Sequence, residues 1–265
     1  MRNNPELDNP LAATAISFKS PFLEYESLVD HLEASDSLME TFSKQYPEFD
    51  QSCSPFIQLG RVIPRPRTLR THMPFPLLSA TLLDKGKVVY VIRDPRDVCL
   101  SYFHHCRLWT YHDFQGTLDQ FIDAFIGGTA VLFGPYWQHV REAWSRRHHP
   151  HLFITYYEKL KSKQKQKLLR LNSFFGSNVT HQQIEKIMEY TSFEEMKSRK
   201  NHILSSGSAS SFVKSEHLEK EGGFFRKGEA GDWRKDLTEE QKLKFSRWIQ
   251  ENCPDQEIMD NIINP

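Results

Sequence analysis

The sequence has few cysteines, no excess of either charge and no long apolar run. None of its four cysteines belongs to a CxxC pair, and a chain of 265 residues is long for a disulfide scaffold, so we expect a reducing compartment. Lys and Arg together number 34, as do Asp and Glu. This balance argues against a general nucleic-acid binder, which needs a basic surface. The longest apolar stretch, residues 124–133, contains two glycines and falls far short of the ~20 residues of a membrane span.

The first ten residues are polar and lack the apolar core of a signal peptide. We therefore expect a cytoplasmic protein that has neither a membrane nor a nucleic acid as its partner. With 38% apolar residues, the chain can bury one sizeable core, and we expect a single domain over residues 1–265.

Two short apolar runs predict the strands of a parallel sheet. Residues 87–92 form a β-branched run typical of a strand buried on both faces, and a helical segment over 98–109 follows. Residues 152–156 predict a second strand before a charged helix over 159–175, and residues 67–71 predict a weaker third strand. Strand, turn and helix in succession form the repeating unit of α/β folds, which is the class that we expect.

Four further segments have the periodicity of amphipathic helices: residues 118–126, 136–145, 181–190 and 238–252. Thr238 and Gln241 form a capping-box pattern at the start of the last one. Cys99 and Cys106 lie seven residues apart, on one face of a helix, and we interpret both as small apolar core residues. Residues 197–223 are polar and serine-rich, which predicts a mobile surface loop.

An arginine and a serine flank the start of the helix after the first strand. Arg93 ends the strand, and Ser101 lies just past the first helical turn. Ligands of open α/β sheets bind beyond the carboxyl ends of strands, where helix N-termini supply N–H groups and positive potential. The pair fits a phosphate clamp, and a surface ion pair between Arg93 and Asp97 fits the local pattern equally well.

Two adjacent cations follow the serine-rich segment. Arg226 and Lys227 precede Gly228, an arrangement that can place charge and a backbone N–H against one phosphate. A solvated basic turn is the alternative, and composition alone favours it.

His72 lies at the end of the weaker strand, a position that suits a general base because an imidazole can take up a proton near neutral pH. Most single histidines are not catalytic, so an ordinary histidine is the alternative. The cluster of His148, His149 and His151 has no acidic or cysteine residue at ligand spacing, and we expect no metal site.

Five segments, in order, resemble the cytosolic sulfotransferase family: RTHMP at 70–74, VYVIRDPRDVCLSYF at 89–103, TYYE at 155–158, TSFEEM at 191–196 and RKGEAGDW at 226–233. Each segment alone is a weak signal, but the five in the family's order are specific. The resemblance implies an α/β fold with a parallel sheet flanked by helices, related to the nucleotide kinases. It also implies 3′-phosphoadenosine 5′-phosphosulfate (PAPS) as the co-substrate, without a metal.

The resemblance further implies roles for individual residues. The 3′-phosphate of the donor is held by Arg93, Ser101, Arg226, Lys227 and Gly228. The adenine is surrounded by Tyr157, Thr191, Phe193, Phe224 and Phe225. His72 takes the proton from the hydroxyl of a small acceptor, which is a phenol, an alcohol or a steroid-like compound.

The family also has a strand, loop and helix reading TYPKSGTTW, which grips the 5′-phosphosulfate. Nothing in this sequence resembles it, and no GxxxxGK[ST] loop replaces it. We therefore expect a chain that is truncated at its N-terminus relative to the family, lacks a central strand and has little or no sulfotransferase activity. An inactive protein that binds PAPS or its product PAP is the alternative function. The family's dimer motif after Trp233 is degraded, so the oligomeric state stays open.

Overall fold

The structure is a computed structural model that describes residues 20–24, 47, 48, 50, 54–129, 132–198, 214, 225 and 227–263. The chain divides into two compact units. Unit 1 comprises residues 1–72, 108–113 and 178–225, and unit 2 comprises residues 73–107, 114–177 and 226–265. The expectation of a single domain over residues 1–265 stays a prediction.

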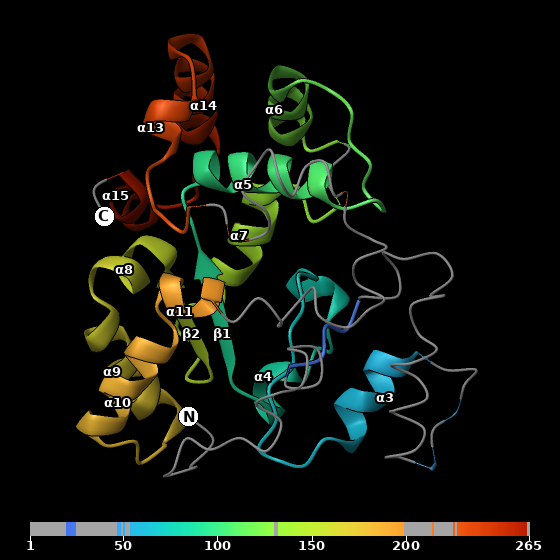
Figure 1. Cartoon of the computed structure of the whole chain (residues 1–265), viewed down its shortest axis with the longest axis vertical. Coiled ribbons are helices and arrows are strands. Elements are labelled where there is room, and N and C mark those ends of the chain that lie inside the picture. Colours follow the sequence, from blue (N-terminus) through green and yellow to red (C-terminus); the bar gives the residue numbers. More distant parts are fainter. Residues whose placement is uncertain are drawn as a thin grey trace. The chain divides into compact units, whose positions relative to one another are not determined.

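Unit 2 is built on two parallel strands, β1 (Val88–Ile92) and β2 (Leu152–Tyr156), paired in the register Val88 to Leu152 and Ile92 to Tyr156. Both strands lie where the sequence predicts them. Figure 1 shows α5 (Pro95–Leu108) following the carboxyl end of β1, so the predicted strand, turn and helix are confirmed. The helix begins earlier than predicted because a proline suits its first position, where no N–H partner is needed.

The other helices of unit 2 come before, between and after these strands in the chain. In order they are η2 (Phe75–Leu77), α4 (Leu82–Lys85), α6 (Leu118–Gly127), α7 (Tyr136–Trp144), α8 (Tyr157–Ser162), α9 (Gln164–Phe175), α13 (Trp233–Asp236), α14 (Glu239–Asn252) and α15 (Gln256–Ile263). The single charged helix predicted over 159–175 is wrong, because Lys163, with φ −132° and ψ 41°, separates α8 from α9. The predicted capping box of α14 is confirmed, since Thr238 and Gln241 exchange hydrogen bonds between side chain and backbone.

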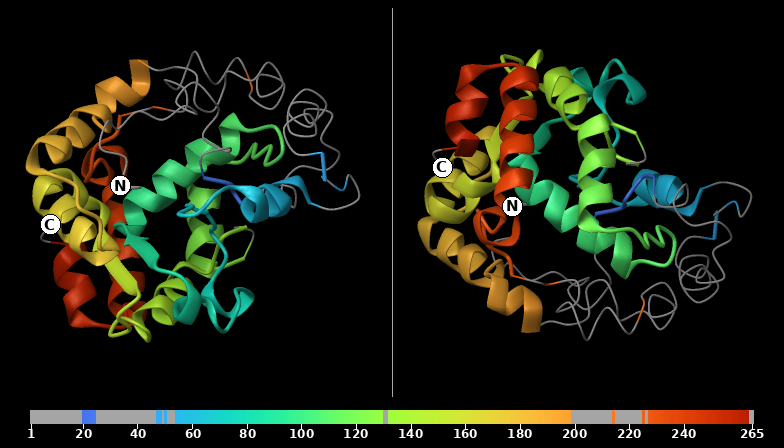
Figure 2. Two further views of the ribbon diagram at one scale, coloured as in Figure 1. Left: turned by 90° about the horizontal axis from the view of Figure 1, so that it is seen from below. Right: turned by 90° about the horizontal axis from the view of Figure 1, so that it is seen from above.

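The core of unit 2 joins β1 and β2 to α5, α6, α7, α14 and α15. Phe245 of α14 and Ile258 of α15 are fully buried, and Figure 2 shows these two helices side by side. Cys99 and Cys106 also belong to this core, which confirms their interpretation as small apolar residues.

Strand β1 is buried on one face only. Ile92 is 1% exposed, whereas Val89 and Val91 on the opposite face are 37% and 49% exposed. The prediction of a strand buried on both faces is therefore wrong. The register gives the reason: Val89 pairs with Phe153 of β2, and the ring of Phe153 packs against Phe174 of α9. Helix α9 thus covers this face over β2 and leaves β1 accessible.

Unit 1 contains α3 (Pro55–Val62), α10 (His181–Tyr190) and α11 (Phe193–Ser198). The predicted strand over residues 67–71 is reduced to an isolated parallel bridge between Phe22 and Arg70. The start of the predicted mobile loop is wrong, because residues 197 and 198 belong to α11. Except for residue 214, the rest of the predicted loop, through residue 223, lies outside the described residues.

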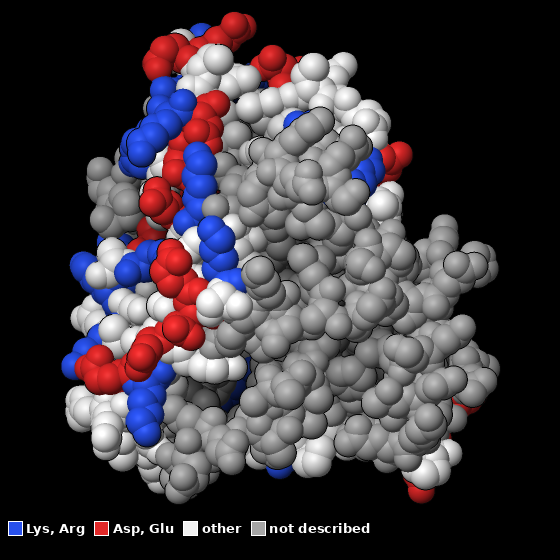
Figure 3. Space-filling model, in the orientation of Figure 1, with Lys and Arg blue, Asp and Glu red and all other residues white. Residues whose placement is uncertain are grey.

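None of the described helices has both the length and the apolar character needed to cross a membrane. In the view of Figure 3, basic and acidic side chains are intermixed over the described surface, and neither sign forms a continuous patch on it.

Candidate functional site

The guanidinium of Arg93 is fixed at the carboxyl end of β1. It lies 4.4 Å over the ring of Tyr157, and its Nη2 donates a hydrogen bond to the carbonyl of Glu229 at 3.1 Å. The same nitrogen is 3.8 Å from Oδ2 of Asp97. Within the described part of the chain, Nε of Arg93 is buried and has no hydrogen-bond partner. A fixed cation with an unused donor is suited to binding an anion.

Asp97 holds the loop that carries Gly228. Its side chain is buried, and its two oxygens accept the backbone N–H groups of Gly231 at 2.6 Å and Trp233 at 3.1 Å. Burial raises the pKa of Asp97, and the two amide hydrogen bonds and Arg93 only partly oppose this. The surface ion pair considered from the sequence is therefore wrong in one respect: Asp97 is buried. Its main partners are backbone amides, which no pattern in the sequence indicated.

Two further buried acids fix the turn between β1 and α5. Arg96 donates to Asp94, with 2.6 Å between Nη2 and Oδ2, and the N–H of Asp94 donates to Glu158 at 2.9 Å. The guanidinium of Arg96 also lies 3.5 Å over the ring of Trp233. Burial raises the pKa of Glu158. These contacts connect the turn to the start of α8 and to the segment after residue 227. The sequence signal for them was only the acidic residues that follow each strand.

Glycines shape the loop beside Arg93. Gly228 and Gly231 have φ values of +67° and +88°, in the region that strongly favours glycine. The carbonyl of Gly228 accepts a hydrogen bond from the hydroxyl of Tyr157 at 3.3 Å. Tyr157 therefore contacts both Arg93 and Gly228, and these predicted ligand residues lie together.

The other residues predicted for the 3′-phosphate differ in their surroundings. Nζ of Lys227 lies 2.9 Å from Asp236 and 3.8 Å from Asp232, and its side chain is 41% exposed. Ser101 is exposed in the second turn of α5. Arg226 lies outside the described residues.

Most residues predicted around the adenine belong to unit 1. Thr191 follows α10, and its hydroxyl donates to the carbonyl of Ile187 at 2.6 Å. Phe193 and Phe225 pack edge to face, with ring centroids 6.2 Å apart. Phe224 lies outside the described residues. Because Tyr157 belongs to unit 2, the complete adenine site stays a prediction.

His72, the candidate base, lies at the end of its segment of unit 1 with its side chain half-exposed. Its Nδ1 is 3.5 Å from Oε1 of Glu24. No sequence pattern indicated Glu24 as its partner, because the two residues are 48 positions apart.

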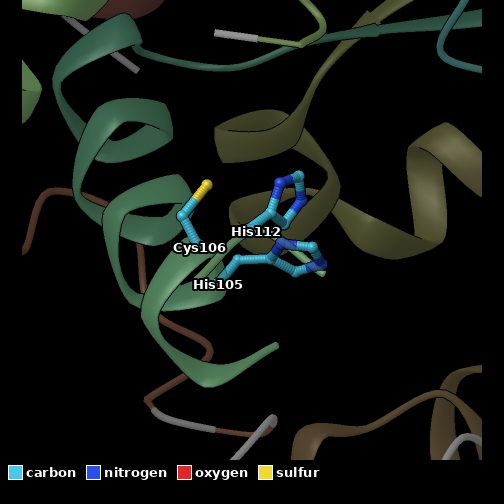
Figure 4. A group of neighbouring side chains, drawn as sticks. All are labelled: His105, Cys106 and His112. Atoms are coloured by element: carbon cyan, nitrogen blue, oxygen red, sulfur yellow. The ribbon is translucent and has the colours of Figure 1, made fainter. Parts of the chain in front are cut away.

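Other residues of the types that bind metals occur after the second turn of α5. His105 and Cys106 lie in its last two turns, in unit 2 (Figure 4). Burial lowers the pKa of His112, which belongs to unit 1. Since the residues belong to different units, we assign no joint site to them.

The sulfotransferase domain profile matches residues 3–257, which is nearly the whole chain. Among curated relatives, the chain is 36% identical over 191 residues to Sulfotransferase 1A1 of Bos taurus, covering 71% of this chain and 62% of that protein. It is 27% identical over 250 residues to the luciferin sulfotransferase of Photinus pyralis, covering 93% of this chain and 65% of that protein. The chain thus spans about 60% of the length of the Sulfotransferase 1A1 proteins of Bos taurus, Canis lupus familiaris and Rattus norvegicus.

Solved structures give the same result. Retinol dehydratase in complex with androsterone and the inactive cofactor PAP has a TM-score of 0.75 and 29% identity, covering 96% of this chain and 75% of that chain. The same values hold for its complex with retinol and PAP. A mouse sulfotransferase complexed with PAP has a TM-score of 0.64 and 27% identity, covering 77% of this chain and 71% of that chain.

These likenesses confirm the predicted α/β fold with a parallel sheet flanked by helices. The expected absence of a central strand stays a prediction. The profile match over residues 3–257 also confirms the family predicted from the five segments. The chain therefore belongs to the sulfotransferase family.

Proposed function

We propose that this protein transfers a sulfuryl group from PAPS to the hydroxyl group of a small acceptor. The observation that carries the proposal is the position of Arg93 at the carboxyl end of β1, over Tyr157 and beside the loop of Gly228. This end of a parallel strand is where ligands of open α/β sheets bind. Nε of Arg93 is buried and has no hydrogen-bond partner among the described residues. It fits a phosphate, because guanidinium groups form strong charge-assisted hydrogen bonds with phosphate oxygens.

Two sets of residues bind the donor, one at its 3′-phosphate and one at its adenine. The 3′-phosphate is held by Arg93, Ser101, Arg226, Lys227 and Gly228. The adenine is surrounded by Tyr157, Thr191, Phe193, Phe224 and Phe225. Lys227 contacts Asp232 and Asp236 in the structure. When the 3′-phosphate binds, it replaces one of these aspartates as the anionic partner of Lys227.

The bound donor supplies the sulfuryl group, and the protein positions the reactants. Sulfuryl transfer resembles phosphoryl transfer, in which in-line positioning and electrostatic stabilisation account for most of the catalysis. His72 takes the proton that the acceptor hydroxyl loses. Its half-exposed side chain suits this role, since the acceptor has to reach the ring.

We also propose a small, largely apolar acceptor and a cytoplasmic location. Related structures hold androsterone or retinol, and both compounds carry a hydroxyl group on an apolar skeleton. The three described cysteines, Cys99, Cys106 and Cys253, are free thiols, as is usual in a reducing compartment.

A transfer assay tests the proposal. The full chain is incubated with PAPS labelled in its sulfuryl group and with a simple phenol, 2-naphthol, and the labelled product is separated and counted. The proposal predicts product above a protein-free control, and calorimetry should show that PAP binds. PAP binding without any transfer would instead support the inactive binding protein, and the absence of both would overturn both functions.

A further inference from the structure

A buried carboxylate lies beside the candidate base. The N–H of Arg70 donates to the carbonyl of Pro21 at 2.8 Å, and the N–H of Leu23 donates to the carbonyl of Arg70 at 3.0 Å. These bonds form an isolated parallel bridge. Glu24 and His72 each stand two residues beyond the bridged pair, in the same direction. Parallel pairing therefore places their side chains level with each other.

One oxygen of Glu24 faces two donors of His72. Oε1 accepts the backbone N–H of His72 and also lies 3.5 Å from Nδ1 of its ring. The side chain of Glu24 is 7% exposed, whereas that of His72 is 51% exposed. The inner edge of the imidazole thus meets a buried acceptor. Nε2 lies on the other edge of the ring, which an acceptor molecule has to approach.

The carboxylate is ionised near neutral pH. Burial acts to raise the pKa of Glu24, but the hydrogen bonds from the ring and the N–H of His72 and from the Thr71 side chain outweigh it, and the pKa is lowered. The charge of Arg70 also acts on Glu24. Among the described residues of the two bridged segments, Glu24 is thus the charged group beside the ring, and Arg70 acts on Glu24.

Aromatic packing holds the imidazole from a second direction. The ring of Phe22 meets the ring of His72 edge-on, with centroids 4.9 Å apart, and the guanidinium of Arg70 lies 5.2 Å from the centroid of Phe22. The ring of His72 is therefore contacted at Nδ1 and at its face or edge by groups of one short segment, residues 21–24.

From this geometry we infer that Glu24 is a positioning residue for His72, an inference that rests on the proposed function. A carboxylate beside Nδ1 keeps the proton on Nδ1 and leaves the lone pair on Nε2. During transfer, the acceptor O–H bond breaks, its proton passes to Nε2 of His72, and the acceptor oxygen bonds to sulfur. The bond from sulfur to the bridging oxygen breaks, and PAP leaves with that electron pair. Glu24 then stabilises the imidazolium, as a buried acid does in a catalytic triad.

Nitrogen-15 NMR of the full chain without nucleotide tests the positioning, since ring shifts report the tautomer of His72. We expect the Nδ1–H tautomer in the wild type, and a shift toward Nε2–H, the form that free histidine prefers, in Glu24→Ala. Glu48→Gln, which changes an exposed acid of the same unit, should leave the spectrum unchanged. An Nε2–H tautomer in the wild type, or no shift in a folded Glu24→Ala, overturns the inference. If Glu24→Ala does not fold, the wild-type spectrum decides.

Kinetics separate this inference from the proposed function. Glu24→Gln keeps the shape and a hydrogen-bond acceptor but removes the charge. It should lower kcat about tenfold or more, because the base keeps its ring but loses the charge that positions it; complete loss of an acid–base group costs about a hundredfold or more. KM for PAPS should stay unchanged. Glu24→Asp should restore part of the loss. If the wild type transfers and Glu24→Gln has the same kcat, the inference is overturned. If the wild type shows no transfer, the proposed function fails, while the tautomer still decides whether Glu24 positions His72.

Discussion

Glu24 in unit 1 and Asp97 in unit 2 are both buried carboxylates that accept backbone N–H groups, yet their charges are balanced differently. Burial opposes ionisation at both positions. At Glu24, the hydrogen bonds from His72 and Thr71 outweigh burial, and the pKa is lowered. At Asp97, burial prevails over the two amide hydrogen bonds and the charge of Arg93, and the pKa is raised.

The difference shows what each carboxylate is placed to do. Asp97 joins the start of α5 to the loop of Gly231 and Trp233. Its hydrogen bonds and Arg93 do not fully offset the cost of burying its charge, so its pKa is raised. Its role is to shape the backbone around Arg93. Glu24 faces an imidazole directly, so its charge is available to act on a side chain that itself takes up a proton.

The largest effect is expected for the base. His72→Ala should lower kcat by about a hundredfold or more, because a positioned acid–base group is lost, while KM for PAPS changes little. Steady-state kinetics measure both constants. His148→Ala, which removes an exposed histidine of unit 2, serves as the control. A raised KM for PAPS with unchanged kcat would show that His72 binds the donor and is not the base. Glu24 would then not act on a catalytic side chain, in contrast to the role proposed for it.

A smaller effect is expected for the cation that Asp97 and its loop surround. Arg93→Ala should weaken PAP binding about 10- to 100-fold, since hydrogen bonds to charged groups contribute about 1.5–3 kcal/mol. Isothermal calorimetry measures the affinity. Arg247→Ala, which removes an exposed arginine of α14, should bind PAP as the wild type does. A Kd for Arg93→Ala equal to that of this control contradicts the assignment.

Asp97→Ala tests the loop itself. It leaves the N–H groups of Gly231 and Trp233 without their acceptor, so the free energy of unfolding should fall by about 1–3 kcal/mol. Urea denaturation measures the change, and Glu251→Ala, at an exposed acid of α14, should stay within about 0.5 kcal/mol of the wild type. Equal stability of the two variants would show that the loop does not depend on Asp97.

The pH dependence of stability gives the smallest and sharpest test, because the two carboxylates should contribute with opposite signs. The raised pKa of Asp97 makes its contribution fall as pH rises from about 3.9, its ordinary value, through the raised folded value. The lowered pKa of Glu24 gives a contribution that is present above about 4.3 and is lost as pH falls through the folded value.

Denaturation at a series of pH values therefore separates the two groups. With rising pH through the acidic range, Asp97→Asn should gain stability relative to the wild type, and Glu24→Gln should lose it. If the stability of both variants relative to the wild type changed in the same direction with pH, the two carboxylates would not have oppositely shifted pKa values.

Local patterns in the sequence predicted β1, β2, several of the helices and the family, and they failed for contacts between distant residues. The apolar runs predicted β1 and β2, but a run alone does not tell which faces are covered, so the exposure of Val89 and Val91 was missed. Arg93 was found because it ends a strand. Asp97 meets Gly231 across 134 positions, and Glu24 meets His72 across 48. No periodicity carries such pairings, because they depend on how the segments pack.

Titration calorimetry of the wild-type protein shows whether this chain recognises the 3′-phosphate of the donor. PAP and adenosine 5′-phosphate are compared under identical buffer and salt, since they differ in the 3′-phosphate alone. PAP should bind at least about tenfold more tightly, the value of one charge-assisted hydrogen bond, and Arg226→Ala should remove most of this preference. Equal affinity of the wild-type protein for the two nucleotides would contradict it.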